Sequence, residues 1–184
     1  MESTEEKIAR LSAETVEITP YNPDWADRYL MERKHIESVL PDGFIVRIEH
    51  VGSTAVPGLA AKPIVDMLIE ISDGERGKTL IPQILEPQGY DCIWRPTRGN
   101  DIPPWYTWCI RRDTEGRRTH HLHFVEPGTK DDLICFRDIL REHSSVAMKY
   151  GELKSDLATE HGHDRVAYTD AKGEFIRTVL EKYK

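Results

Sequence analysis

Hydrophobic and polar positions in the first part of the chain recur with two different periods. Apolar side chains follow three- and four-residue steps through residues 23–40, which predicts an amphipathic helix with Asn22 as its cap. Residues 44–51 instead alternate between apolar and polar side chains, and this period of two predicts a strand. A second strand is expected at residues 62–71, whose apolar content is typical of a central strand.

The remainder of the chain is predicted to add strands to the sheet and then to become helical. A short helix is expected at residues 79–86, where Pro82 is tolerated only in the first turn. Further strands are expected at residues 90–94, 105–111 and 119–125. From Asp131 onward the apolar positions follow helical spacing, and the last helix is expected to begin at Thr169-Asp170. This order predicts an α/β (α+β) domain with a mixed sheet flanked by helices and a helical C-terminal tail.

Length and composition fit one folded domain. The 184 residues are expected to build a single core over residues 16–184, after a flexible arm at residues 1–15. Hydrophobic residues make up 39% of the chain, and no apolar run approaches the roughly 18 residues that span a membrane. The N-terminus lacks the basic-then-apolar order of a secretory signal. A soluble, cytoplasmic protein without a membrane partner is therefore expected.

The cysteines lie far apart in the sequence, at Cys92, Cys109 and Cys135. Their number is odd and no C-x-x-C pair occurs, which argues against both a disulfide framework and a zinc knuckle. Reduced and mostly buried thiols are the expectation.

The charge distribution contains one local exception to an acidic chain. The net charge of −7 disfavours general binding to nucleic acids, because such binding depends on Lys and Arg neutralising phosphates. Between Arg95 and Arg118, however, six arginines stand against Asp101, Asp113 and Glu115. This segment predicts an anionic small molecule as the partner. A solvated loop with scattered charges is the alternative interpretation.

Gly52 and Ser53 directly follow the first predicted strand. A turn at this place can direct backbone N–H groups and a hydroxyl at a phosphate oxygen, although Gly-Ser is an ordinary turn far more often. Asp66 supports the phosphate interpretation, since a carboxylate within an apolar strand has to be paired, hydrogen-bonded or bound to a metal. Its alternative is a buried carboxylate that accepts hydrogen bonds from a neighbouring loop.

The run HVGSTAVPGLAAKPIVDMLIEI at residues 50–71 resembles the signature of the GrpB family. The block HHLHFVEPG at residues 120–128 is similar to the His-Leu-His stretch of that family, and the C-terminal tail also resembles it. The resemblance covers nearly the whole chain from Val16. It implies a nucleotidyltransferase-like fold, in which a Gly-Ser loop precedes a strand that carries metal-binding carboxylates.

The chain departs from active nucleotidyltransferases at one position of this strand. Those enzymes usually carry two acidic residues that are one apart and share a face of the strand, and here the second position is Leu68. Glu70 shares the face of Asp66, but four residues of strand span roughly 13 Å, too far for one ion. The usual two-metal nucleotidyl transfer is therefore in doubt.

His121 and His123 are predicted to point to the same face of the strand at residues 119–125. With Asp66 they would give a two-His-one-carboxylate set for a divalent metal, with Mg, Mn, Fe and Zn as candidates. The alternative chemistry is proton transfer, because an imidazole titrates near neutral pH. Histidines that only stabilise the strand are the third interpretation.

Together these features predict a protein that acts on a nucleotide or another anionic small molecule, as a candidate nucleotidyltransferase-like transferase. Asp66, His121 and His123 are expected to share one catalytic and metal-binding site. The candidate ligand-binding residues are His50, Gly52, Ser53, Thr54, Lys62 and Arg111. Two alternatives stay open: a noncatalytic module whose degenerate transferase pocket still binds ligand, and a metal-dependent enzyme of another reaction class.

Overall fold

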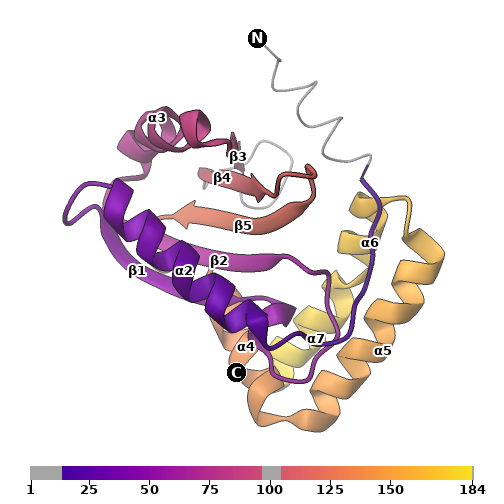
Figure 1. Cartoon of the computed structure of the whole chain (residues 1–184). Helices are drawn as coiled ribbons and strands as arrows, with labels where there is room; N and C mark the ends of the chain where they lie inside the picture. The colour runs from indigo at the N-terminus through magenta and orange to yellow at the C-terminus, as the bar shows by residue number, and fades with distance from the viewer. Residues whose placement is uncertain (1–13, 97–104, 184) are drawn as a thin grey trace.

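The computed structural model describes residues 14–96 and 105–183 and contains a five-stranded sheet in the order β1-β2-β5-β4-β3 (Figure 1). Its strands are β1 (Ile45–Val51), β2 (Val65–Ile71), β3 (Asp91–Pro96), β4 (Trp105–Arg112) and β5 (Arg118–Val125). β2 and β5 pair in parallel, and the other neighbours pair antiparallel. The predicted mixed sheet is thus confirmed.

Helices lie on both faces of this sheet. The described helices are α2 (Asp24–Val39), α3 (Gly74–Leu85), α4 (Asp131–Glu142), α5 (Ser144–His161), α6 (Arg165–Ala171) and α7 (Gly173–Tyr183). α2 and α3 share the largest apolar cluster with the sheet, whereas α4 contributes Leu133 and Ile134 to a smaller cluster around Leu68. α5, α6 and α7 gather at one end of the sheet (Figure 1). The predicted helix-flanked α/β architecture is confirmed.

The period of two in β2 decides which face carries the polar groups. Met67 and Ile69 belong to the apolar cluster under α2 and α3. Leu68 belongs to the cluster that includes residues of α4, on the opposite face. Since successive side chains alternate between faces, Asp66 and Glu70 point to the α4 side with Leu68.

Two helix boundaries differ from those expected. α3 begins at Gly74 rather than residue 79, because the Asp73 side chain caps it by accepting a hydrogen bond from the Arg76 N–H at 2.8 Å. Pro82 therefore lies well inside the helix, and the expectation that it occupies the first turn was wrong. Thr169 and Asp170 lie within α6, which is capped by Asp164.

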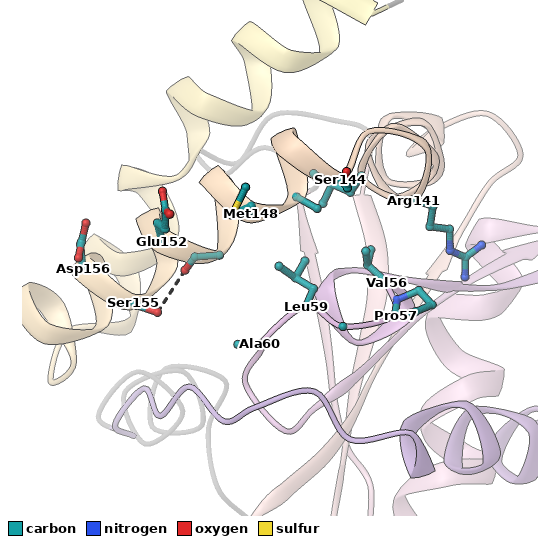
Figure 2. Close-up of a pocket in the computed structure, with 14 residues that line it drawn as sticks. Val56, Pro57, Leu59, Ala60, Arg141, Ser144, Met148, Glu152, Ser155 and Asp156 are labelled. Carbon is teal, nitrogen blue, oxygen red and sulfur yellow. Dashed lines mark hydrogen bonds between the residues drawn. The ribbon is translucent and has the colours of Figure 1, made fainter.

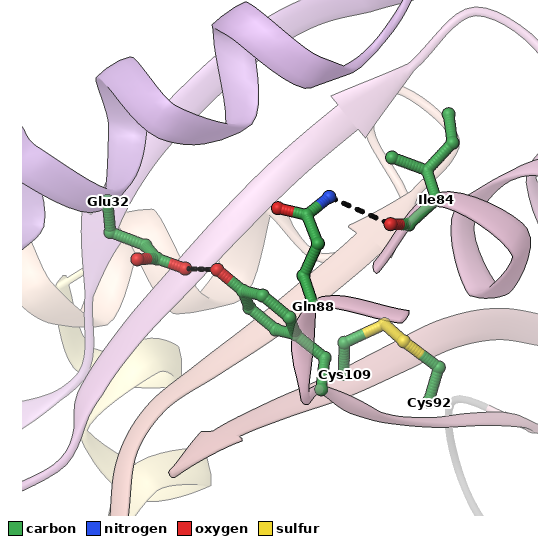
Figure 3. The surroundings of a disulfide bond; sticks show 6 residues. Glu32, Ile84, Gln88, Cys92 and Cys109 are labelled. Carbon is green, nitrogen blue, oxygen red and sulfur yellow. Dashed lines mark hydrogen bonds between the residues drawn. A yellow bond between two sulfur atoms is a disulfide. The ribbon is translucent and has the colours of Figure 1, made fainter. Parts of the chain in front are cut away.

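The expectation of reduced thiols was wrong for two of the cysteines. Cys92 and Cys109 form a disulfide (Figure 3), whereas Cys135 is free. The antiparallel register of β3 and β4 places Cys92 directly opposite Cys109, and only this pairing brings together two residues that are 17 apart in sequence. Spacing alone does not reveal such a register.

The N-terminal arm predicted at residues 1–15 lies outside the described residues as far as residue 13. Glu14, at its end, already contacts the folded chain through Arg112 and Arg118. Among the described residues, no helix is long and apolar enough to cross a membrane.

Candidate functional site

Asp66 and His121 meet because β2 and β5 are parallel neighbours in register at these two residues. The Asp66 Oδ1 atom lies 3.0 Å from His121 Nδ1 and 4.0 Å from His123 Nε2. The Asp66 side chain remains 31% exposed, compared with 10% for His121 and 17% for His123. The structure therefore brings the three residues predicted from sequence to one place, with the carboxylate at the solvent side.

The hydrogen bonds of His121 define its tautomer. A carboxylate can only accept, so Nδ1–H donates to Asp66. Nε2 accepts a hydrogen bond from Arg118 Nη1 at 3.4 Å, and Glu14 holds that guanidinium at 2.6 Å. Burial lowers the pKa of His121 to about 4, against the opposing effect of Asp66. Burial alone would raise the pKa of Asp66, but the hydrogen bond and charge of His121 hold it well below its usual value.

Stability is expected to fall as the pH drops from about 6.5 to 4. Burial lowers the pKa of both His50 and His121 from 6.5 to about 4. In this window the unfolded chain binds protons that the folded chain excludes, so acid favours unfolding by up to about 1.4 kcal/mol per pH unit for each histidine. Urea denaturation at pH 7 and pH 5 measures this slope, and His121→Gln should reduce it. Equal stability at both pH values would show that these histidines are not buried in the neutral form.

Gly52 packs directly against the Asp66 carboxylate. Its φ of 72° lies in the region that favours glycine, and a Cβ atom added there would lie 2.6 Å from Asp66 Oδ2. Ser53 follows, and its side chain hydrogen-bonds to Tyr150 of α5. The Gly-Ser loop predicted from sequence thus borders the Asp66 site.

His50 and Thr54 pair with each other rather than with Asp66. His50 Nε2 lies 3.0 Å from Thr54 Oγ1, and the imidazole stacks on Tyr29 of α2 at 4.8 Å between ring centroids. Because α2 covers the opposite face of the sheet, this pair shapes the Gly-Ser loop from the other side. Neither residue is paired with Asp66 in the described hydrogen bonds, and their role in ligand binding stays a prediction.

Arg111 lies on the opposite face of the sheet from Asp66, which corrects its expected role as a ligand clamp. It forms an ion pair with Glu32 of α2, on the face to which neighbouring Cys109 also points. The alternation of β4 decides this placement. Most described arginines of the predicted cationic segment are paired in the same way, and Arg98 lies outside the described residues.

The cationic side chains near Asp66 come instead from separate parts of the chain. The negative charge of Asp66 raises the pKa values of four of them. These are Lys62 before β2, Lys130 before α4, Arg165 of α6 and Lys172 directly after α6. Only Lys62 was predicted. Lys130, Arg165 and Lys172 carry no periodic signal in the sequence, because their position depends on how α4 and α6 pack.

The metal set predicted from sequence fits this environment poorly. Within residues 14–96 and 105–183, no group of three or more His, Cys, Asp or Glu side chains is arranged to hold a metal ion. Leu68, where the sequence resemblance leads one to look for a second carboxylate, is 1% exposed in an apolar cluster. Glu70 is bound by Arg47 at 2.6 Å and by the Gly128 N–H at 3.1 Å. A carboxylate surrounded by cations suits an anionic ligand better than a divalent cation, and the metal stays a prediction.

A large surface cavity lies elsewhere, between the loop at residues 56–60 and α5 (Figure 2). Its volume is about 870 Å³, and its lining includes Leu59 and Met148. Asp66, His121 and His123 are not among its lining residues. This cavity is therefore separate from the Asp66 site.

Comparisons of this chain with known proteins all lead to members of one family. The UPF0157 protein YqkA of Bacillus subtilis is 36% identical over 175 residues, which cover 92% of this chain and 47% of that protein. A UPF0157 protein of Pseudomonas aeruginosa is 36% identical over 90% of this chain and 66% of its own length. The chain thus spans about half of one relative and two thirds of the other.

The fold also matches that of a solved protein structure. The crystal structure of conserved protein GrpB from Enterococcus faecalis superimposes with a TM-score of 0.76 at 29% identity, covering 91% of this chain and 96% of that chain. The GrpB protein family model matches residues 15–182. Because this match spans almost the whole sequence, the chain belongs to the GrpB family.

Proposed function

We propose that this GrpB-family protein is an enzyme that binds a nucleotide or another anionic small molecule and uses Asp66 and His121 for proton transfer. The supporting observation is the 3.0 Å contact between Asp66 Oδ1 and His121 Nδ1, at a carboxylate that stays 31% exposed. A carboxylate–imidazole pair whose carboxylate faces solvent can exchange a proton with a bound molecule.

Each residue of the pair has a separate task in this proposal. Asp66 accepts the Nδ1–H of His121 and so fixes the tautomer, which leaves Nε2 as the proton-accepting atom. In the structure Arg118 donates a hydrogen bond to Nε2. In the proposal an anionic substrate binds this guanidinium and so frees Nε2 to accept a proton. The Nδ1 atom of His123 is buried and has no hydrogen-bond partner in the described part of the chain, which leaves one polar atom beside the pair to be satisfied.

The anionic class of ligand follows from the charges around Asp66. Lys62, Lys130, Arg165 and Lys172 all interact with this single carboxylate. Burial lowers the pKa of Lys62 to about 7 and that of Lys130 to about 8. A negatively charged ligand would restore their preference for the protonated form. A nucleotide carries such charge on its phosphates.

A noncatalytic binding module is the second candidate, and one observation favours it. Leu68 is 1% exposed where active nucleotidyltransferases carry a second carboxylate. Its burial in an apolar cluster supports loss of the two-metal reaction while the cationic site is kept.

The test is calorimetric titration of the full chain with ATP, combined with ³¹P NMR of ATP turnover. Asp66→Asn and His121→Gln should each lower turnover by at least about 100-fold, because general acid–base catalysis contributes roughly 10² to 10⁴. The double variant should lose less than the product of the two single effects, since the residues act as a unit. Glu75→Gln removes one negative charge, as Asp66→Asn does, but at an exposed position of α3, and its ATP turnover should equal that of wild type.

Three outcomes would change the proposal. ATP binding without turnover would favour the noncatalytic module. ATP binding that is insensitive to added salt would contradict an anion site. Binding of MnCl₂ alone, lost equally in Asp66→Asn, His121→Gln and His123→Gln, would support the metal site predicted from sequence instead.

A further inference from the structure

Lys62, Arg165 and Lys172 gather around the ring of Tyr168, beside the Asp66 site. The Nζ atom of Lys62 lies 5.3 Å from the Tyr168 ring centroid, and that of Lys172 lies 4.3 Å from it. Arg165 precedes Tyr168 by three residues on α6, so the two side chains share one side of the helix. Tyr168 itself is 1% exposed. Three cationic groups are thus fixed around one buried aromatic ring.

The positive charge of this group is not matched by carboxylates. In the described part of the chain, no carboxylate lies within 4.0 Å of the Lys62 or Lys172 ammonium. Arg165 Nη1 lies 3.7 Å from Glu14, but that carboxylate also binds Arg112 at 2.7 Å and Arg118 at 2.6 Å. The cluster therefore carries an excess of positive charge.

The state of the side chains agrees with this excess. Arg165 is 12% exposed, and its Nη2 atom is buried without a hydrogen-bond partner among the described residues. Burial lowers the pKa of Lys172 to about 8, with repulsion from Arg165 adding to it. The Tyr168 ring supports the two ammonium groups through cation–π contacts but supplies no counter-charge. Such groups are costly to bury unless something pairs with them.

A compact dianion meets these requirements better than other ligands. Phosphate offers several acceptor oxygens to donors that converge from different directions, and it brings two negative charges. A nucleic-acid polymer is disfavoured, because the chain as a whole carries a net charge of −7. A small molecule with a terminal phosphate is the remaining class.

We propose that Lys62, Arg165 and Lys172 form a subsite for the dianionic phosphate group of a small-molecule ligand. The inference rests on the proposed function: the negative charge of Asp66 raises the pKa of all three cations without forming an ion pair with any of them among the described residues, so a ligand anchored on them would extend toward Asp66 and His121. The subsite specifies the substrate class: a phosphorylated molecule whose phosphate is held apart from the reactive pair. α6 thereby has a role in binding.

The test uses inorganic phosphate and sulfate as probes in calorimetric titrations of the full chain. Wild type should bind one dianion, and Lys172→Gln should weaken binding at least tenfold, since a hydrogen bond to a charged group is lost. Lys149→Gln, the same charge change at an exposed position of α5, should leave the affinity unchanged. Wild-type affinity in Lys172→Gln, or no binding of either probe to wild type, would overturn the subsite.

Two further measurements separate the subsite from unfolding and from the proposed function. Without phosphate, Lys172→Gln should melt at or above the wild-type temperature, because a half-buried cation without a carboxylate partner is removed. Asp66→Asn should bind phosphate at least as tightly as wild type, since a repelling carboxylate is gone, while it loses turnover. If Asp66→Asn loses turnover but Lys172→Gln binds phosphate normally, the subsite fails and the proposed function stands.

Discussion

Replacing Arg111 by methionine is expected to lower the free energy of unfolding by about 1 to 3 kcal/mol, because its partner Glu32 is fully buried whereas the Arg111 side chain itself is 44% exposed. Glu32 of α2 is 0% exposed, and its carboxylate contacts only the Arg111 guanidinium and the Tyr90 hydroxyl in the described hydrogen-bond network, the hydroxyl donating at 2.5 Å. Figure 3 shows Glu32 near the disulfide-bearing strands. Without Arg111 the Glu32 carboxylate keeps only the neutral Tyr90 hydroxyl as a donor, and a buried carboxylate without a cationic partner is costly.

Urea denaturation measures this loss, and two variants control it. Arg117→Met removes an arginine that is 69% exposed and paired with Asp113, so it should leave the free energy of unfolding nearly unchanged. The double variant Glu32→Met/Arg111→Met should recover most of the stability, because no buried charge is left. If Arg111→Met instead keeps its stability and weakens ATP binding, Arg111 is a ligand contact as the sequence suggested.

Gly52→Val is expected to lower the free energy of unfolding by about 3 kcal/mol or more and to displace the Asp66 carboxylate. The backbone at Gly52 has φ 72° and ψ −173°, a conformation that is essentially restricted to glycine and costs other residues on the order of 1 to 3 kcal/mol. A Cβ atom would also lie 2.6 Å from Asp66 Oδ2, so the carboxylate has to move. Movement of Asp66 breaks its hydrogen bond with His121.

Gly58 provides a matched control for this effect. It has φ 79°, but a Cβ atom there meets nothing within 4 Å. Gly58→Val should therefore show only the backbone strain, whereas Gly52→Val should also change the ¹⁵N chemical shifts of His121 in NMR. Equal stability losses and unchanged His121 signals in both variants would show that Gly52 does not position Asp66.

The periodic patterns of the sequence were sufficient for most elements of the fold and for singling out three residues that the structure brings together. The alternation of residues 44–51 and 119–125 predicted β1 and β5, and the helical spacing of residues 23–40 predicted α2. Asp66 stood out because a charged residue in an apolar strand needs a partner. His121 and His123 stood out because the period of two places both on one face.

Only the tertiary structure decided which of these polar groups meet. Strand order and register join Asp66 to His121 and Cys92 to Cys109, and neither follows from spacing along the chain. Arg111 points to the face of β4 that is covered by α2, where it pairs with Glu32 away from the site. The packing of α6 brings Lys172 near Lys62, which is 110 residues earlier in the numbering, around Tyr168. Local periodicity fixes the face of a side chain within its own element, whereas contacts between elements depend on packing across the whole core.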